Sequence, residues 1–110
     1  MTSTTVRRIT LFKVPDEDKQ LKLVKAYRTM KKELLEEKKR SILLLDVAKA
    51  TDDPRSKGYT VAAIMSFGSR ADMEEYEECP AHKALQEVAK GLVAEPPLVV
   101  VLEGETDVTN

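Results

Sequence analysis

The sequence of 110 residues predicts an α+β fold in which helices cover one face of a four-stranded antiparallel sheet. Its β-type and helical segments follow the order β-α-β-β-α-β, the split βαβ or ferredoxin-like arrangement. The length suits one domain over residues 1–110, and no repeat or linker divides it. The second and fourth β-type segments are apolar on both faces, which indicates that a further layer covers the sheet.

The first half of the chain contains a strand followed by a long helix. After a Thr-rich start that we expect to be frayed, "VRRITLFKV" (6–14) predicts a strand with Ile9 and Leu11 on one face and Phe12 on the other. Pro15 ends it, and "DEDK" places acids where a helix N-terminus favours them. From about residue 16 to 39, apolar residues recur at helical spacing. They are Leu23, Val24, Tyr27, Met30, Leu34 and Leu35.

Two further strands follow this helix. "SILLLDVAKA" (41–50) is apolar over most of its length, and "TDDPRSKG" has the residues of a turn. "YTVAAIMSF" (59–67) then predicts a third strand. One of its faces carries Tyr59, Val61, Ala63, Met65 and Phe67, and the other carries mostly small side chains.

The last part of the sequence predicts two short helices and a strand. Gly68 and Ser69 open a helix from Arg70 to about Cys79, with Met73 and Tyr76 turned inward. Another helix starts at Pro80, a residue favoured at the first helical position. Its apolar stripe comprises Leu85, Val88, Ala89 and Leu92. "PPLVVVLEG" (96–104) predicts the fourth strand, and residues 105–110 a polar tail.

Helices on one face leave the other face of the sheet uncovered, although residues 42–45 and 98–102 are apolar on both faces. A monomer seldom exposes an apolar patch larger than about 300–600 Å². A two-fold pairing of identical faces is the commonest way to cover one. We therefore expect a homodimer whose two sheets face each other, a dimeric α/β barrel.

The composition argues against several other classes of partner. A net charge of -1 does not favour binding to the negatively charged phosphate backbone of nucleic acid. One Cys and one His cannot by themselves form a disulfide or a zinc site, and the acids between residues 72 and 78 are typical of a solvated helix face. No segment has the apolar core of a secretory signal or of a membrane span. We expect a cytoplasmic protein without a metal or an organic cofactor.

Three segments resemble the stress-responsive dimeric A/B barrel (Dabb) family over about residues 6–103: "VRRITLFKV", "DPRSKGYTVAAIMSF" and "SRADMEEYEECPAHKALQEVAKGLV". The resemblance implies a dimeric α/β barrel. The Tyr-x-x-x-Pro-Ala-His segment is also similar to that of olivetolic acid cyclase, an enzymatic member. That similarity implies that Tyr76 and His82 could close a polyketide ring without a cofactor. Where many members carry a His in the first strand, this chain has Arg8.

His82 lies in the first turn of the helix that starts at Pro80. The partial positive charge there disfavours the imidazolium, so the neutral ring could act as a general base. Tyr76 could donate its phenol to a carbonyl oxygen as enolate charge develops. Alternatively, His82 only completes the junction between two helices while Tyr76 packs in the core. Cys79 as a nucleophile is a weaker hypothesis, since no orienting Asn or Asp is indicated.

Three functions remain open, and we rank first a stable dimeric scaffold associated with stress, which is non-catalytic or binds a small apolar ligand only weakly. The second is a cofactor-independent polyketide cyclase or lyase that uses His82 as base and Tyr76 as donor. The third is a carrier of a small hydrophobic or aromatic ligand held between sheet and helices. A cavity of several hundred Å³ reaching Tyr76 and His82 favours the second or third, and a filled interior favours the first. The expected lining is Phe12, Leu23, Tyr27, Phe67, Tyr76 and His82.

Overall fold

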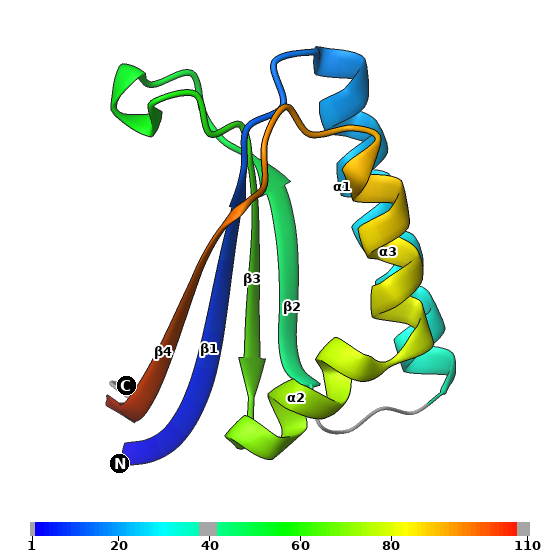
Figure 1. The fold of residues 1–110 in the computed structure, drawn as a ribbon. Coiled ribbons are helices and arrows are strands. Elements are labelled where there is room, and N and C mark those ends of the chain that lie inside the picture. Colours follow the sequence, from blue (N-terminus) through cyan, green and yellow to red (C-terminus); the bar gives the residue numbers. More distant parts are fainter. Residues whose placement is uncertain (1, 38–41, 108–110) are drawn as a thin grey trace.

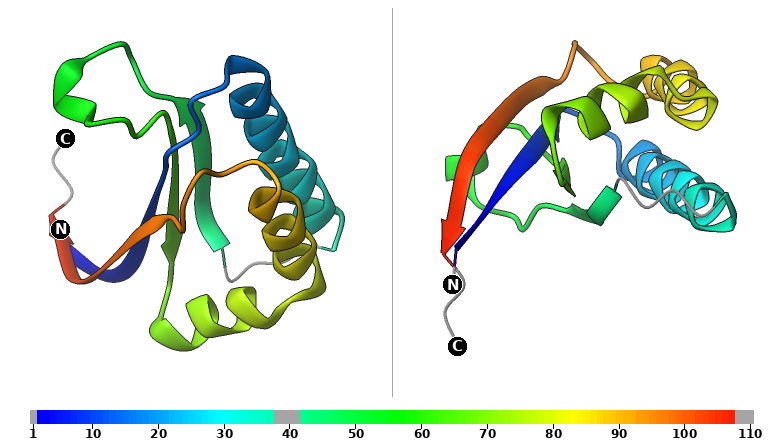
Figure 2. Two further views of the ribbon diagram at one scale, coloured as in Figure 1. Left: turned by 45° about the horizontal axis from the view of Figure 1, so that its top comes forward. Right: turned by 90° about the horizontal axis from the view of Figure 1, so that it is seen from below.

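The computed structural model describes residues 2–37 and 42–107 and confirms the predicted α+β order (Figure 1). The sheet is antiparallel with strand order β2-β3-β1-β4. All three helices lie on one of its faces, as the two views of Figure 2 show. The elements are β1 (Thr2–Phe12), α1 (Glu17–Glu36), β2 (Ile42–Lys49), a 3-10 turn (Pro54–Ser56), β3 (Val61–Phe67), α2 (Arg70–Glu78), α3 (Pro80–Lys90) and β4 (Leu98–Asp107).

The ends of the chain differ from the prediction. The start that was expected to be frayed is part of β1, and β4 continues to Asp107 through the first half of the expected polar tail. The two segments pair with each other, from Thr2 with Asp107 to Thr5 with Gly104. Backbone hydrogen bonds between strands require no particular side chain. A polar segment can therefore form a strand when another strand lies beside it and pairs with it. The predicted end of the first helix near residue 39 and the start of the second strand at residue 41 lie outside the described residues.

Side-chain hydrogen bonds fix the start of α1. The carboxylate of Asp16 accepts the backbone N–H of Lys19 at 3.1 Å, which caps the helix. The buried amide of Gln20 donates to the carbonyl of Val14 at 2.7 Å and ties the helix to the end of β1. The predicted apolar face is confirmed except at Leu35, which is 69% exposed. Leu35 lies about 100° around the helix from the buried Leu34 and so points away from the sheet.

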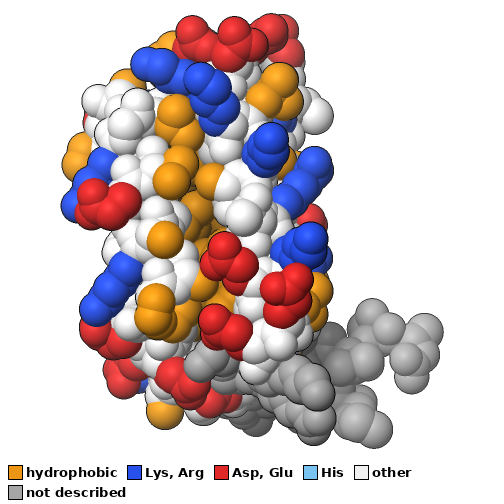
Figure 3. Space-filling model, turned by 90° about the vertical axis from the view of Figure 1, so that its right-hand side faces the viewer, with side chains coloured by type: hydrophobic (Ala, Val, Ile, Leu, Met, Phe, Trp, Pro, Cys, Tyr) orange, Lys and Arg blue, Asp and Glu red, His pale blue; other side chains and the backbone are white. Residues whose placement is uncertain are grey.

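The core lies between α1 and the helix-facing side of the sheet. Alternate residues of β1 and β3 point into it, and so do Met73 and Tyr76 of α2 as predicted. Its largest fully buried side chains are Phe67, Leu23, Met65, Val6, Val14 and Val61. Outside this core, the surface of α1 and α3 carries charged side chains on both sides of an apolar groove (Figure 3). The half-exposed Val88, which was predicted to belong to the apolar stripe of α3, lines this groove.

The opposite side of the sheet carries no helix among the described residues. The pairing of Ile9 with Ile64 and Val100, and of Leu11 with Leu98, places these side chains on one surface. We call this surface the open face. Its large apolar members are Ile9, Leu11, Leu44, Ile64, Leu98, Val100 and Leu102, and the last five are at least 40% exposed in the single chain.

Candidate functional site

A cavity of about 460 Å³ lies between α3 and the helix-facing side of β1. It exists because α3 packs mainly against α1 and α2 rather than on the sheet. Its walls come from β1, α1, α3 and the loop that leads to β4. The lining residues are Arg8, Thr10, Phe12, Tyr27, His82, Leu85, Gln86, Ala89, Lys90, Val93, Glu95, Pro96 and Pro97.

The junction between α2 and α3 places His82 in this cavity. Cys79 is extended, with φ -73° and ψ 149°, and Pro80 begins α3, as predicted. The ring nitrogen Nδ1 of His82 lies 3.1 Å from the backbone carbonyl oxygen of Glu77. Because a carbonyl oxygen can only accept a hydrogen bond, Nδ1 carries the proton and Nε2 is left as the acceptor. His82 therefore both completes the helix junction and lines the cavity.

The surroundings of His82 favour its neutral form. Burial lowers the pKa of its imidazole, and the nearby positive charge of Arg8 lowers it further. The hydrogen bond to the Glu77 carbonyl opposes this change without reversing it. At neutral pH the ring can accept a proton at Nε2.

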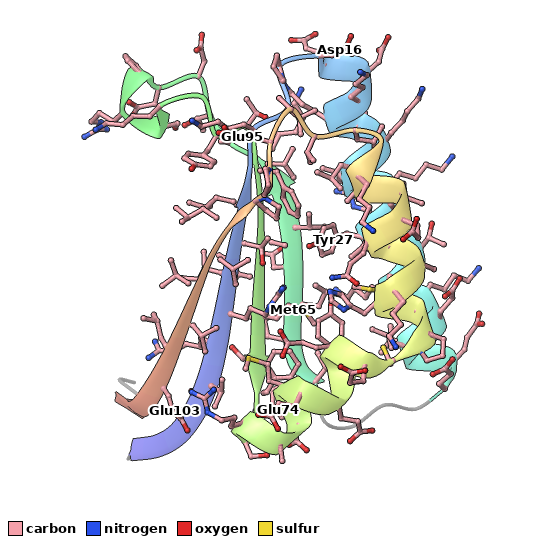
Figure 4. The ribbon with its side chains drawn as sticks, viewed as in Figure 1. Asp16, Tyr27, Met65, Glu74, Glu95 and Glu103 are labelled. Carbon is pink, nitrogen blue, oxygen red and sulfur yellow. The ribbon has the colours of Figure 1, made fainter. Side chains whose placement is uncertain are left out.

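The structure separates the roles of two tyrosines. Tyr76 packs against His82, with ring centroids 4.5 Å apart, and its hydroxyl meets Met30 Sδ at 3.7 Å. It is buried behind His82 and does not line the cavity. Tyr27 does line it, from a position between α1 and the sheet (Figure 4). Burial raises the pKa of Tyr27 to about 12, so its phenol stays protonated as a potential donor.

Arg8 is a lining residue that the sequence interpretation did not select. It shares the helix-facing side of β1 with Val6, Thr10 and Phe12, and only 9% of it is exposed. Its Nη1 donates to Thr10 Oγ1 at 3.0 Å, and its Nε lies 3.7 Å from Glu77 Oε2. The available signal was a charged residue at an inward-facing position of an alternating strand.

The other predicted site residues divide between the cavity and the core. Phe12 lines the cavity, and its ring packs edge to face against that of Tyr27, with the ring centroids 5.9 Å apart. Leu23 and Phe67 are fully buried in the core and do not reach it. Cys79 is buried at the helix junction.

Over residues 2–37 and 42–107, no three His, Cys, Asp or Glu side chains converge on a possible metal site. No helix there has both the length and the hydropathy to cross a membrane.

Comparisons with known proteins agree with this fold. The model of the stress responsive A/B barrel domain (Dabb) family matches residues 6–103. A curated Gibberella zeae protein named "Fusaristatin A biosynthesis cluster protein" is 36% identical over 84 residues, which cover 76% of this chain. The match spans about three fifths of that relative's length (61%).

Solved structures with a similar fold share little sequence with this chain. A dimeric ferredoxin-like protein of unknown function from Jannaschia sp. CCS1 has a TM-score of 0.77 at 17% identity, covering 91% of this chain and 99% of its own. A Nitrosomonas europaea protein, provisionally described as an antibiotic biosynthesis monooxygenase, has a TM-score of 0.74 at 16% identity. That match covers 94% of this chain and 92% of the other. At this level of identity, the likeness concerns the fold.

The lowered pKa of His82 predicts a specific titration. We expect its imidazole resonances to titrate below the ordinary value of 6.5, because burial and Arg8 disfavour the charged ring. Nuclear magnetic resonance can follow this residue directly, since it is the only His of the chain. A midpoint at or above 6.5 would contradict the described environment.

The same shift sets the sign of a stability change. Below pH 6.5 the unfolded chain binds a proton at this position more readily than the folded one, so stability falls with acidification until both forms are protonated. The His82→Gln variant, which has no titrating ring, should lose less stability between pH 7.5 and pH 5 than the wild type in urea unfolding.

Proposed function

The chain belongs to the stress responsive A/B barrel domain family, and from this premise we propose that it is a homodimer whose subunits each bind a small, largely apolar molecule. The observation that carries the proposal is the cavity between α3 and β1. Its volume of about 460 Å³ lies within the usual range of ligand sites, roughly 300–1,000 Å³. This cavity favours ligand binding over the inert scaffold that ranks first from the sequence alone.

The chemistry of the lining supports such a ligand. Phe12, Leu85 and Val93 provide apolar walls from three different segments. Tyr27 and His82 add polar groups that can orient what is bound. A few polar groups in a mainly apolar cleft are typical of sites for small organic molecules. The name of the Gibberella zeae relative, a biosynthesis cluster protein, adds support for a role in small-molecule metabolism.

The open face supports the homodimer. Its apolar side chains form a continuous surface across β4, β1, β3 and β2, of the kind that soluble proteins normally cover. Arg7 lies on the same face, and its Nε is buried without a hydrogen-bond partner among the described residues. A second copy packed on this face would remove the apolar groups from water and could supply an acceptor for Arg7.

One observation favours a second function, proton abstraction at an activated carbon in the manner of a cofactor-independent cyclase or lyase. His82 is held by Nδ1, which leaves Nε2 as a base in a cavity that also contains the Tyr27 phenol. A positioned base contributes about 10²–10⁴-fold to such a step. In this proposal Tyr27, rather than Tyr76, donates to the developing enolate oxygen, because Tyr76 lies outside the cavity.

Filling the cavity tests the binding function. Ala89 lines the cavity from α3, whereas Ala84 on the same helix is exposed and lines the separate groove between α1 and α3. We expect wild-type protein to bind the apolar fluorescent probe anilinonaphthalene sulfonate. Ala89→Phe should weaken binding about tenfold or more, because the new ring occupies the cavity. Ala84→Phe is the matched control and should bind as the wild type does. Equal binding by both variants would place the probe elsewhere.

A charge on the open face tests the dimer. Val100 and Val101 are adjacent in β4 and about equally exposed, at 40% and 38%, but point to opposite faces of the sheet. We expect Val100→Glu to convert the dimer to monomer at micromolar concentration in sedimentation velocity, because it would bury a carboxylate in an apolar interface. Val101→Glu should remain dimeric. A wild-type protein that sediments as a folded monomer would exclude the proposed assembly.

Deuterium exchange tests the proton-abstraction function. An apolar 1,3-diketone such as benzoylacetone should take up deuterium at its central carbon faster when the protein is added. His82→Gln should remove about 10²–10⁴-fold of the catalysed rate. Tyr27→Phe should slow the reaction, and Tyr76→Phe should leave it near the wild-type rate, because only Tyr27 lines the cavity. No rate difference between wild type and His82→Gln would leave binding as the function.

A further inference from the structure

Arg8 is the only Lys or Arg side chain that is buried among the described residues. Its guanidinium lies on the helix-facing side of β1 and lines the cavity together with Tyr27 and His82. A guanidinium group carries a positive charge under ordinary conditions. A permanent cation therefore lies at the inner wall of a mainly apolar cavity, where an unpaired charge is unfavourable.

Within the chain, the guanidinium of Arg8 has only part of the hydrogen bonds and opposite charge that a buried cation needs. Thr10 accepts one hydrogen bond from Nη1, and the Tyr27 hydroxyl also interacts with the guanidinium, but neither group carries a charge. Glu77 Oε2 lies 3.7 Å from Nε, beyond hydrogen-bond distance, and its side chain is 38% exposed to water. The buried Nε has no hydrogen-bond partner among the described residues. The two-bond Arg–carboxylate pairing that normally satisfies a buried guanidinium is not made by Glu77.

Other charged groups around the cavity do not cancel this charge. Glu95, which lines the cavity, is already paired with Lys13 at 3.0 Å. Lys90, another lining residue, is paired with Glu87 at 3.1 Å. The imidazole of His82 and the phenol of Tyr27 are neutral at pH 7. Among the described residues, Arg8 is therefore the charged lining residue that lacks a hydrogen-bonded partner of opposite charge.

We propose that Arg8 forms a carboxylate-binding subsite, so that the cavity takes small molecules with an apolar body and one carboxylate. The planar guanidinium matches the two oxygens of a carboxylate, and the apolar walls fit the rest of the molecule. In this arrangement Arg8 holds the carboxylate end of the ligand next to His82 and Tyr27. This inference rests on the proposed binding function and adds the chemical class of its ligand.

A matched pair of probes tests the subsite. 4-Phenylbutanoate and 4-phenylbutanamide have nearly the same shape and differ in charge. Isothermal titration calorimetry of the wild type should show that the carboxylate binds about tenfold or more tightly than the amide. Arg8→Met should abolish this preference while it retains the affinity for the amide. Lys90→Met, which removes the other lining cation, should retain the preference.

Each alternative result overturns a definite part of this account. Equal binding of both probes to the wild type would remove the subsite and leave the cavity function intact. Binding of neither probe would overturn both. Loss of the preference in Lys90→Met but not in Arg8→Met would place the carboxylate at Lys90 instead.

A measurement on the wild type makes the test independent of the folding of Arg8→Met. The Nε–H resonance of Arg8 should shift on addition of 4-phenylbutanoate and stay unchanged with the amide. An unchanged resonance at saturating carboxylate would exclude contact with this guanidinium.

Discussion

The structure depends on a mismatch of width between one helix and a four-stranded sheet. Neighbouring strands are about 4.8 Å apart, whereas a helix with its side chains is about 10 Å across, so one helix covers about two strands. Here α1 packs over β2 and β3, whereas α3 packs against α1 and α2. The half of the sheet formed by β1 and β4 therefore lies under a helix that does not rest on it. The cavity occupies that space.

The same arrangement gives the two sides of the sheet different chemistry. On the helix side, β1 contributes Arg8 and Thr10 to the cavity between its buried apolar residues. On the open face, the alternate residues Ile9 and Leu11 meet apolar neighbours from β3 and β4. One strand thus carries two of the polar groups of the cavity and the middle of the surface that we propose as the dimer interface. A change of one residue in its register would exchange the two sets.

Electrostatics in the cavity link three residues from different elements. Burial lowers the pKa of His82, and the charge of Arg8 lowers it further, so the imidazole is neutral. The junction between α2 and α3 fixes its tautomer through the Glu77 carbonyl. Tyr27 remains protonated because it is buried. The cavity thus combines a fixed cation, a neutral base and a neutral donor. This combination suits a ligand whose negative charge is already present or develops close to these groups.

The sequence by itself determined the order of the elements, the buried face of α1, the start of α3 at Pro80 and the apolar character of both faces of β4. These features follow from local spacing and composition, which the chain carries without reference to distant parts. It could not give the true ends of β1 and β4, because these depend on pairing between segments about one hundred residues apart. Only the tertiary structure showed that Tyr27 rather than Tyr76 lines the cavity and that Arg8 is its buried cation. Which side chains border a cavity depends on how far α3 stands from the sheet, and that distance is set by packing among three helices rather than by any local pattern.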